Sequence, residues 1–165
     1  MDTFNKLAEL FRSFPGIGPR QAKRFVFFLL TRDGEFLGQF TKLVGALTKE
    51  VTQCRECFRF FQRRVGVALC SICADKNRDG TQLMIVATDT DLDAIEKSGV
   101  YHGRYFVLGG TAPLLEKKAG TSPRLKEAQA RVARETKKGI LKEVILGLSA
   151  NPEGEYTSDE LRKLL

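Results

Sequence analysis

Apolar residues in the first third of the chain recur at three- and four-residue steps, which is the spacing of a helix with one buried face. One such stripe covers residues 2–14, a second covers 22–30 and a third covers 36–51. The segment Pro-Gly-Ile-Gly-Pro at 15–19 separates the first two, and its last proline suits the first position of a helix. The pattern therefore predicts that residues 1–53 are helical.

The pattern changes after residue 80. The runs at 83–87, 105–108 and 143–146 are short and continuously apolar, which is typical of strands buried on both faces of a sheet. Helical stretches near 90–98 and 123–138 lie between them. Strands that alternate with helices favour a small, mostly parallel sheet with helices on its faces. We therefore expect an α/β fold here and an α+β chain overall.

Charge is unevenly distributed over the 165 residues, whose formal net charge is +7. Residues 1–80 hold 14 Lys and Arg against 8 Asp and Glu, whereas residues 81–165 hold 13 against 12. The basic excess suggests an acidic partner such as nucleic acid, although a solvated surface alone could give the same bias. No apolar run approaches the ~20 residues that cross a bilayer. Because the chain also opens without a secretory segment, we expect a cytoplasmic protein with no membrane partner.

Four cysteines form two close pairs, Cys54 with Cys57 and Cys70 with Cys73, separated by twelve residues. This spacing suits one tetrahedral Zn²⁺ held by two thiolate pairs. With sulfur at all four positions the ion has no open site for water, so we expect structural zinc, with catalytic zinc as the alternative. Two disulfides are the other alternative, which a reducing cytosol disfavours. The metal would cross-link and stabilise a segment that is too small to form a hydrophobic core of its own.

The loop between the first two helical stripes is a candidate phosphate site. Gly16 and Gly18 allow backbone angles closed to other residues, so successive N–H groups can face an anion at a helix start. Arg20 and Arg24 lie four residues apart, hence on one helix face, and Lys23 lies beside them. Such a hairpin would grip phosphates without reading bases. A tight turn between packed helices is the alternative.

Charged residues of the second half have simpler interpretations. We expect Asp89, Asp91 and Asp93 to cap a helix start, where carboxylates meet unpaired N–H groups; a weak magnesium site or a partner contact are the alternatives. Four basic residues of the later helical stretch are interpreted as a solvated face, with an extended basic surface as the alternative: Arg131, Arg134, Lys137 and Lys138.

Four motifs occur in one order along the chain: the loop at 14–19, the cysteines of 54–73, Tyr-Phe-Val-Leu-Gly-Gly at 105–110 and Asn-Pro-Glu-Gly-Glu at 151–155. In this order and spacing the sequence resembles the RecR family of bacterial recombination mediators, over essentially the whole chain. The resemblance implies a helix-hairpin-helix DNA-binding module at 1–53, a four-cysteine zinc module at 54–80 and a Toprim domain at 81–165.

The resemblance also implies a function. RecR-like proteins are DNA-binding accessory proteins of recombinational repair in the bacterial cytoplasm, where they associate with the nucleoid. They work with RecO- or RecF-type partners, help to load RecA onto single-stranded DNA and are not known for catalysis. They assemble into dimers or rings of four, aided by further strand and helix beyond the point where this sequence ends, so the number of subunits stays open.

Some of the family's functional residues have matching residues in this sequence, and others do not. Basic residues of the second hairpin helix contact DNA in the family, and the matching Arg20 and Arg24 are both basic, while the zinc ligands match the four cysteines. A Toprim enzyme holds magnesium with a glutamate after its first strand and a later Asp-x-Asp pair. Those positions fall at Ala87 and near 149–151, where no carboxylate stands. A non-enzymatic protein is therefore expected.

Two rival functions remain from the sequence. One is a magnesium-dependent nicking or primase-like enzyme that uses Asp89, Asp91 and Glu153. The other is a protein-interaction adaptor that makes no DNA contact of its own.

Overall fold

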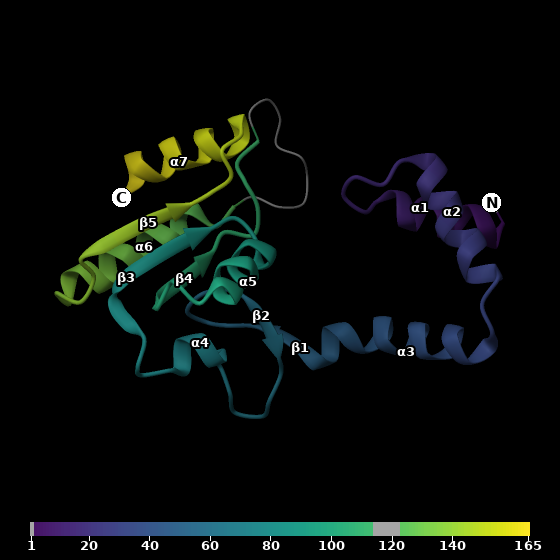
Figure 1. Cartoon of the computed structure of the whole chain (residues 1–165), viewed down its shortest axis with the longest axis horizontal. Helices are drawn as coiled ribbons and strands as arrows, with labels where there is room; N and C mark the ends of the chain where they lie inside the picture. Colours follow the sequence, from purple (N-terminus) through teal and green to yellow (C-terminus); the bar gives the residue numbers. More distant parts are fainter. Residues whose placement is uncertain (1, 114–122) are drawn as a thin grey trace. The chain divides into compact units, whose positions relative to one another are not determined.

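The computed structural model describes residues 2–113 and 123–165 and divides into two units, Met1–Glu50 and Val51–Leu165. Figure 1 labels their helices and strands. The first unit is built from α1 (Thr3–Arg12), α2 (Pro19–Leu30) and α3 (Gly34–Glu50).

Helices α1 and α2 pack against each other as a hairpin. The rings of Phe4 and Phe27 lie 5.0 Å apart between centroids, and those of Phe11 and Phe25 lie 5.4 Å apart in an edge-to-face arrangement. Small residues on the facing sides of the two helices, such as Ala22, are buried between them. The first two predicted helices are thereby confirmed.

Helix α3 differs because none of its 17 residues is buried. Its apolar stripe is exposed, with Leu43 and Leu47 each more than half accessible. The prediction of helix through residue 53 is wrong, because α3 ends at Glu50 and Val51–Gln53 forms a strand. The reason is pairing: Val51 and Thr52, which favour strands, bond with a second strand after the first cysteine pair.

The described residues of the second unit form a small hairpin, a parallel sheet and four helices. Its elements are β1 (Val51–Gln53), β2 (Phe60–Gln62), α4 (Ser71–Ala74), β3 (Asp79–Val86), α5 (Asp89–Ser98), β4 (Gly103–Val107), α6 (Leu125–Lys137), β5 (Glu143–Gly147) and α7 (Pro152–Leu164). Strands β1 and β2 pair antiparallel, whereas β3 lies between β4 and β5 and pairs parallel with both. The predicted α/β fold with a parallel sheet is confirmed.

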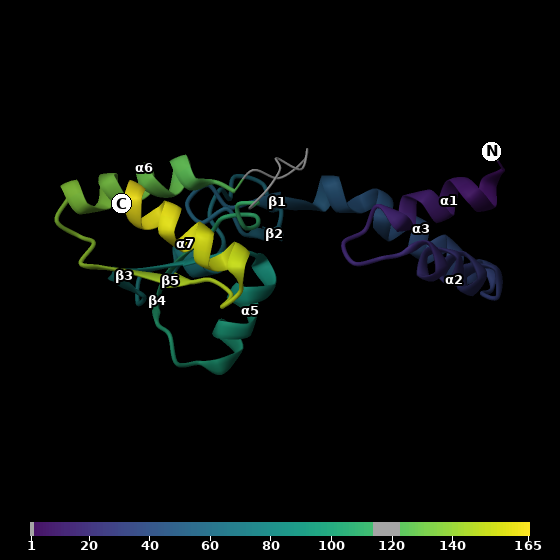
Figure 2. The ribbon, with the colours of Figure 1, turned by 90° about the horizontal axis from the view of Figure 1, so that it is seen from above.

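Strict alternation along β3 and β4 gives the sheet two apolar faces. Leu83 of β3 and Phe106 of β4 belong to a core closed by α6 and α7, while Val86 and Tyr105 belong to a core shared with α5 and the four cysteines. Figure 2 shows α6 and α7 on one side of the sheet and α5 on the other. Burial on both faces explains why these strands read as continuous apolar runs.

Helix α7 begins at the Asn-Pro-Glu-Gly segment, in which Asn151, Pro152 and Gly154 each have a local structural role. Asn151 is the N-cap and its side chain accepts a hydrogen bond from the Gly154 N–H at 2.8 Å, while Pro152 takes the first helical turn, where no N–H is needed. A Cβ on Gly154 would stand 2.0 Å from the carbonyl oxygen of Ser149. Glycine is therefore required for the chain to turn from β5 into α7.

Candidate functional site

The loop between α1 and α2 is a tight turn with an open helix start. Gly16 adopts a left-handed backbone angle (φ 75°), and the Ile17 N–H donates to the Phe14 carbonyl at 3.1 Å. Gly18 is the N-cap of α2, and no side chain caps that helix. The first N–H groups of α2 are thus available to an external acceptor, at the positive end of the helix dipole.

Three basic side chains surround this helix start. Arg20, Lys23 and Arg24 are all exposed, and none forms an ion pair within residues 2–113 and 123–165. Arg24 donates only to the amide oxygen of Gln21, at 3.2 Å. Three cations without an anionic partner in the described residues thus follow free N–H groups at a helix start, and a phosphate can bind both kinds of group.

The four cysteines converge on one point. Their sulfur atoms all lie within 4.8 Å of one another, and those of Cys57 and Cys70 are 3.6 Å apart. Sulfurs around a tetrahedral zinc with Zn–S bonds of about 2.3 Å would be roughly 3.8 Å apart, so the donor set fits. All four thiols are free and buried, as a structural site requires. The chain thus positions four cysteines for one metal ion.

Backbone geometry around the first cysteine pair holds the sulfurs in place. The Cys54 N–H donates to the Arg59 carbonyl at 2.9 Å, and the Phe58 N–H donates to the Cys54 carbonyl at 3.0 Å. Phe58 completes this turn with a left-handed backbone angle (φ 61°), which is uncommon for a bulky residue. Its ring packs edge-on against Phe106 of β4 at 5.3 Å, and this packing offsets the strain.

The proximity of the thiols shifts their protonation in opposite directions. Hydrogen bonds from Cys57, Cys70 and Cys73 lower the pKa of the Cys54 thiol, whereas the neighbouring sulfurs and then burial raise the pKa of Cys57. Thiolates are the form that binds metal. Proton release from this cluster therefore accompanies metal binding.

The cysteine segment is tied closely to the sheet. The Val107 N–H of β4 donates to the Cys57 carbonyl at 2.8 Å, and the Phe60 N–H donates to Asp89 Oδ1 at 2.8 Å. Arg59 forms an ion pair with Asp93 of α5 at 3.3 Å. These contacts use two of the three acids that the sequence singled out.

The third acid caps its helix. Thr88 is the N-cap of α5 and accepts from the Asp91 N–H, while the Asp91 carboxylate accepts from the Thr88 N–H at 2.9 Å, which completes a capping box. The capping prediction is confirmed for Asp91. Within the described residues only the four cysteines bring three or more potential metal ligands within 4.8 Å, so Asp89, Asp91 and Glu153 do not gather into a site.

Arg131 is a residue whose position the sequence did not predict. It is 3% exposed, and its Nη1 donates to the carbonyl oxygens of Glu56 at 2.7 Å and Tyr105 at 2.9 Å. Its Nε donates to Glu135 at 2.9 Å. One guanidinium thereby joins the loop between Cys54 and Cys57 to β4 and α6.

The prediction that Arg131 lies on a solvated face is therefore wrong. The reason is helical position: Arg131 stands on the same inward side of α6 as the buried Ala128 and Val132. One signal in the sequence could have indicated an inward ion pair. Arg131 and Glu135 are four residues apart, so they share a helix face, and Ala128 and Val132 lie on the same side. Arg134, Lys137 and Lys138 are exposed, as predicted.

Comparison with known proteins identifies the modules. Residues 4–49 match the family described as RecR, helix-hairpin-helix, and residues 81–165 match the Toprim domain. Together with the fold, these matches define a helix-hairpin-helix protein with a Toprim domain.

Similarity to individual proteins shows which family within this class the chain belongs to. Recombination protein RecR of Rhodospirillum rubrum is 37% identical over 161 residues, which cover 98% of this chain and 78% of the relative. That of Ureaplasma urealyticum serovar 10 is 32% identical over 162 residues, 98% of this chain and 77% of the relative. That of Legionella pneumophila subsp. pneumophila is 32% identical over 165 residues, covering 100% and 79%. The chain belongs to the RecR family of recombination proteins.

None of the described helices combines the length and the apolar character needed to cross a membrane.

Proposed function

We propose that this protein is a DNA-binding, non-enzymatic accessory protein of recombinational repair that works with RecO- or RecF-type partners to help load RecA onto single-stranded DNA. Family membership supports this role. We further propose three modules, 1–53, 54–80 and 81–165, and a cytoplasmic, nucleoid-associated location. The observation that carries DNA binding is the open start of α2 with three unpaired cations beside it.

In this proposal the hairpin grips the sugar-phosphate backbone. The free N–H groups in the first turn of α2 donate to one phosphate, and Arg20 and Arg24, one turn apart on α2, hold its neighbours with Lys23. Backbone and arginine contacts of this kind give affinity and register without base readout.

The metal has a structural role in this proposal. Cys54, Cys57, Cys70 and Cys73 would hold one Zn²⁺, which supplies a fourfold cross-link between two short segments. Among the described residues, Asp89, Asp91 and Glu153 do not gather into one site, which argues against a Toprim-type magnesium site built from a glutamate and an acid pair.

The double substitution Arg20→Glu/Arg24→Glu should weaken DNA binding by about a hundredfold or more at low salt, because it replaces two phosphate contacts with repulsion. Fluorescence anisotropy with labelled single- and double-stranded oligonucleotides measures this. The matched control is Lys6→Glu/Arg12→Glu, which reverses two exposed charges on α1. Equal affinities of the two variants would refute the hairpin grip.

We also propose that the protein self-associates, as a dimer or a ring of four, through the apolar stripe of α3. Phe40, Leu43 and Leu47 are exposed by 37%, 59% and 58%, on a helix none of whose residues is fully buried in the part of the chain that the structure describes. An uncovered stripe of this kind marks an interaction surface.

The substitution Leu43→Glu/Leu47→Glu is expected to reduce the assembly size, since burying two carboxylates in an apolar interface is costly. Light scattering coupled to size exclusion measures the mass. The control Gln39→Glu/Lys42→Glu places acids elsewhere on the same helix and should leave the mass unchanged. A wild-type protein that is monomeric at all concentrations would contradict the proposal.

A further inference from the structure

A second basic surface lies on the cysteine segment, apart from the hairpin. It is a groove of about 450 Å³, which we call the arginine groove, lined by Arg55, Arg63 and Arg64 together with Thr52 and Gln53 of β1. All three arginines are exposed. The groove thus presents three guanidinium groups and two polar side chains on one concave surface.

The loop that carries these arginines is closed by backbone hydrogen bonds. The Arg55 N–H donates to the Ala68 carbonyl at 3.1 Å, and the Val67 N–H donates to the Arg64 carbonyl at 3.1 Å. Gly66 allows the turn with a left-handed angle (φ 75°). The two sides of the groove are therefore held together rather than left as a free loop.

The three arginines have no anionic partner within the described part of the chain, whereas nearby arginines do. Arg59 pairs with Asp93, and Arg78 pairs with Glu96. Like charges placed together repel, and an external anion would relieve that repulsion. Guanidinium forks match phosphate oxygens in a bidentate geometry, and threonine and glutamine side chains are common additional donors to the nucleic-acid backbone.

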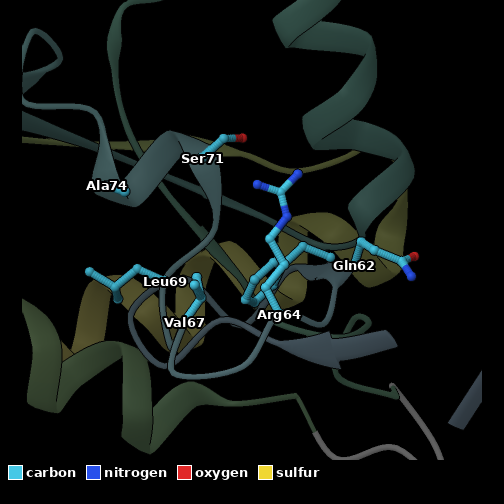
Figure 3. A pocket seen from close by; sticks show the side chains of 7 residues that line it. Gln62, Arg64, Val67, Leu69, Ser71 and Ala74 are labelled. Carbon is cyan, nitrogen blue, oxygen red and sulfur yellow. The ribbon is translucent and has the colours of Figure 1, made fainter. Parts of the chain in front are cut away.

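An apolar cavity of about 340 Å³ adjoins the groove and shares Arg64 and Val67 with it. Figure 3 shows Arg64 at this cavity, its guanidinium extending toward the Ser71 side. Phe61 and Leu69 supply apolar walls. A cavity with an aromatic wall and polar side chains, beside a row of cations, suits an unpaired base next to its own phosphates, and the stacked interior of a duplex cannot offer such a base.

We propose that the arginine groove binds the phosphodiester backbone of single-stranded nucleic acid, with an unstacked base entering the adjoining cavity. This deepens the proposed function, on which it rests, by adding a second DNA contact that is separate from the hairpin. Arg55 lies within the first cysteine pair, and Arg63 and Arg64 lie between the two pairs in sequence, so the cysteine cluster positions the residues that make the contact.

The test is the triple substitution Arg55→Gln/Arg63→Gln/Arg64→Gln in the full chain. The probe is a labelled oligothymidylate of about 30 nucleotides, titrated across a range of salt, beside a duplex of equal length. We expect about tenfold weaker binding of the single strand in ~50 mM salt, and a salt slope shallower by about two, since each lost single-strand phosphate contact removes ~0.7. Duplex binding should change less.

The matched control is Lys97→Gln/Arg162→Gln/Lys163→Gln, which removes three exposed positive charges from the same unit. Circular dichroism melting checks that both variants fold. A triple variant that binds the single strand like this control overturns the groove proposal, as does a loss that is equal on single strand and duplex. If Arg20→Glu/Arg24→Glu loses binding and the groove variant does not, the groove proposal alone is refuted. If the wild-type protein binds no DNA, the proposed function itself is refuted.

Discussion

Replacing Cys57 by serine is expected to lower the free energy of unfolding of the second unit by about 4 kcal/mol or more. Cys57 is fully buried in the core that joins the cysteine segment to Val86, Tyr105 and Val107 of the sheet. A serine cannot replace a thiolate ligand, so the variant should lose most of the metal-binding free energy, which reaches ~10 kcal/mol or more in small zinc domains. Denaturant unfolding and the zinc-to-protein ratio measure the two effects together.

Two controls separate metal loss from an ordinary core substitution. Wild-type protein stripped with a chelator should unfold like the Cys57→Ser variant, and added zinc should restore only the wild type. Ser71→Ala changes a side chain next to Cys70 but no sulfur, so its stability should be near that of the wild type. A variant without metal that unfolds at the same denaturant concentration as the metal-bound wild type would contradict a structural role for the site.

The substitution Arg131→Met is expected to destabilise the second unit by about 3–5 kcal/mol, the usual cost of removing one partner from a buried ion pair. It leaves the Glu135 carboxylate and the carbonyl oxygens of Glu56 and Tyr105 without their donor. Methionine fills similar volume, so the loss measures hydrogen bonding and charge more than cavity formation. Urea unfolding followed by circular dichroism gives the value.

Arg134→Met is the matched control for Arg131→Met. Arg134 lies on the same helix and pairs with the same Glu56, but its side chain is 48% exposed, so its loss should cost about 1 kcal/mol or less. A double substitution with Glu135→Gln should be less destabilising than the sum of the two single changes, because both remove the same contact. Additive effects, or equal costs for Arg131 and Arg134, would count against the buried guanidinium as the link between the modules.

Much of the fold could be predicted because its signals are local. The three strands of the parallel sheet read as apolar runs, although β5 at its edge is only half-buried, and the aromatic stripes of α1 and α2 read as helices with one packed face. The four cysteines carry their ligand geometry in their spacing.

Other features depend on contacts between residues far apart in sequence. The three-residue strands β1 and β2 are too short to show a period, and the polar helix α7 is fixed by the close approach of Gly154 to Ser149 rather than by an apolar stripe. The partners of Arg131 at positions 56 and 105 come from other elements, which no local pattern reveals. The alternating acids could not be assigned individually for the same reason, since Asp89 is used by the distant Phe60.

The hydrogen bond from Val107 to the Cys57 carbonyl has a further consequence. Strand β4 is one of the two edge strands of the sheet formed by the described residues, and the turn of the first cysteine pair occupies a backbone donor on its free side. An uncovered strand edge is a template for pairing with other chains. We expect a protein molecule that loses its metal to release this turn and uncover the strand edge, so the metal-free protein should aggregate more readily than the metal-bound protein.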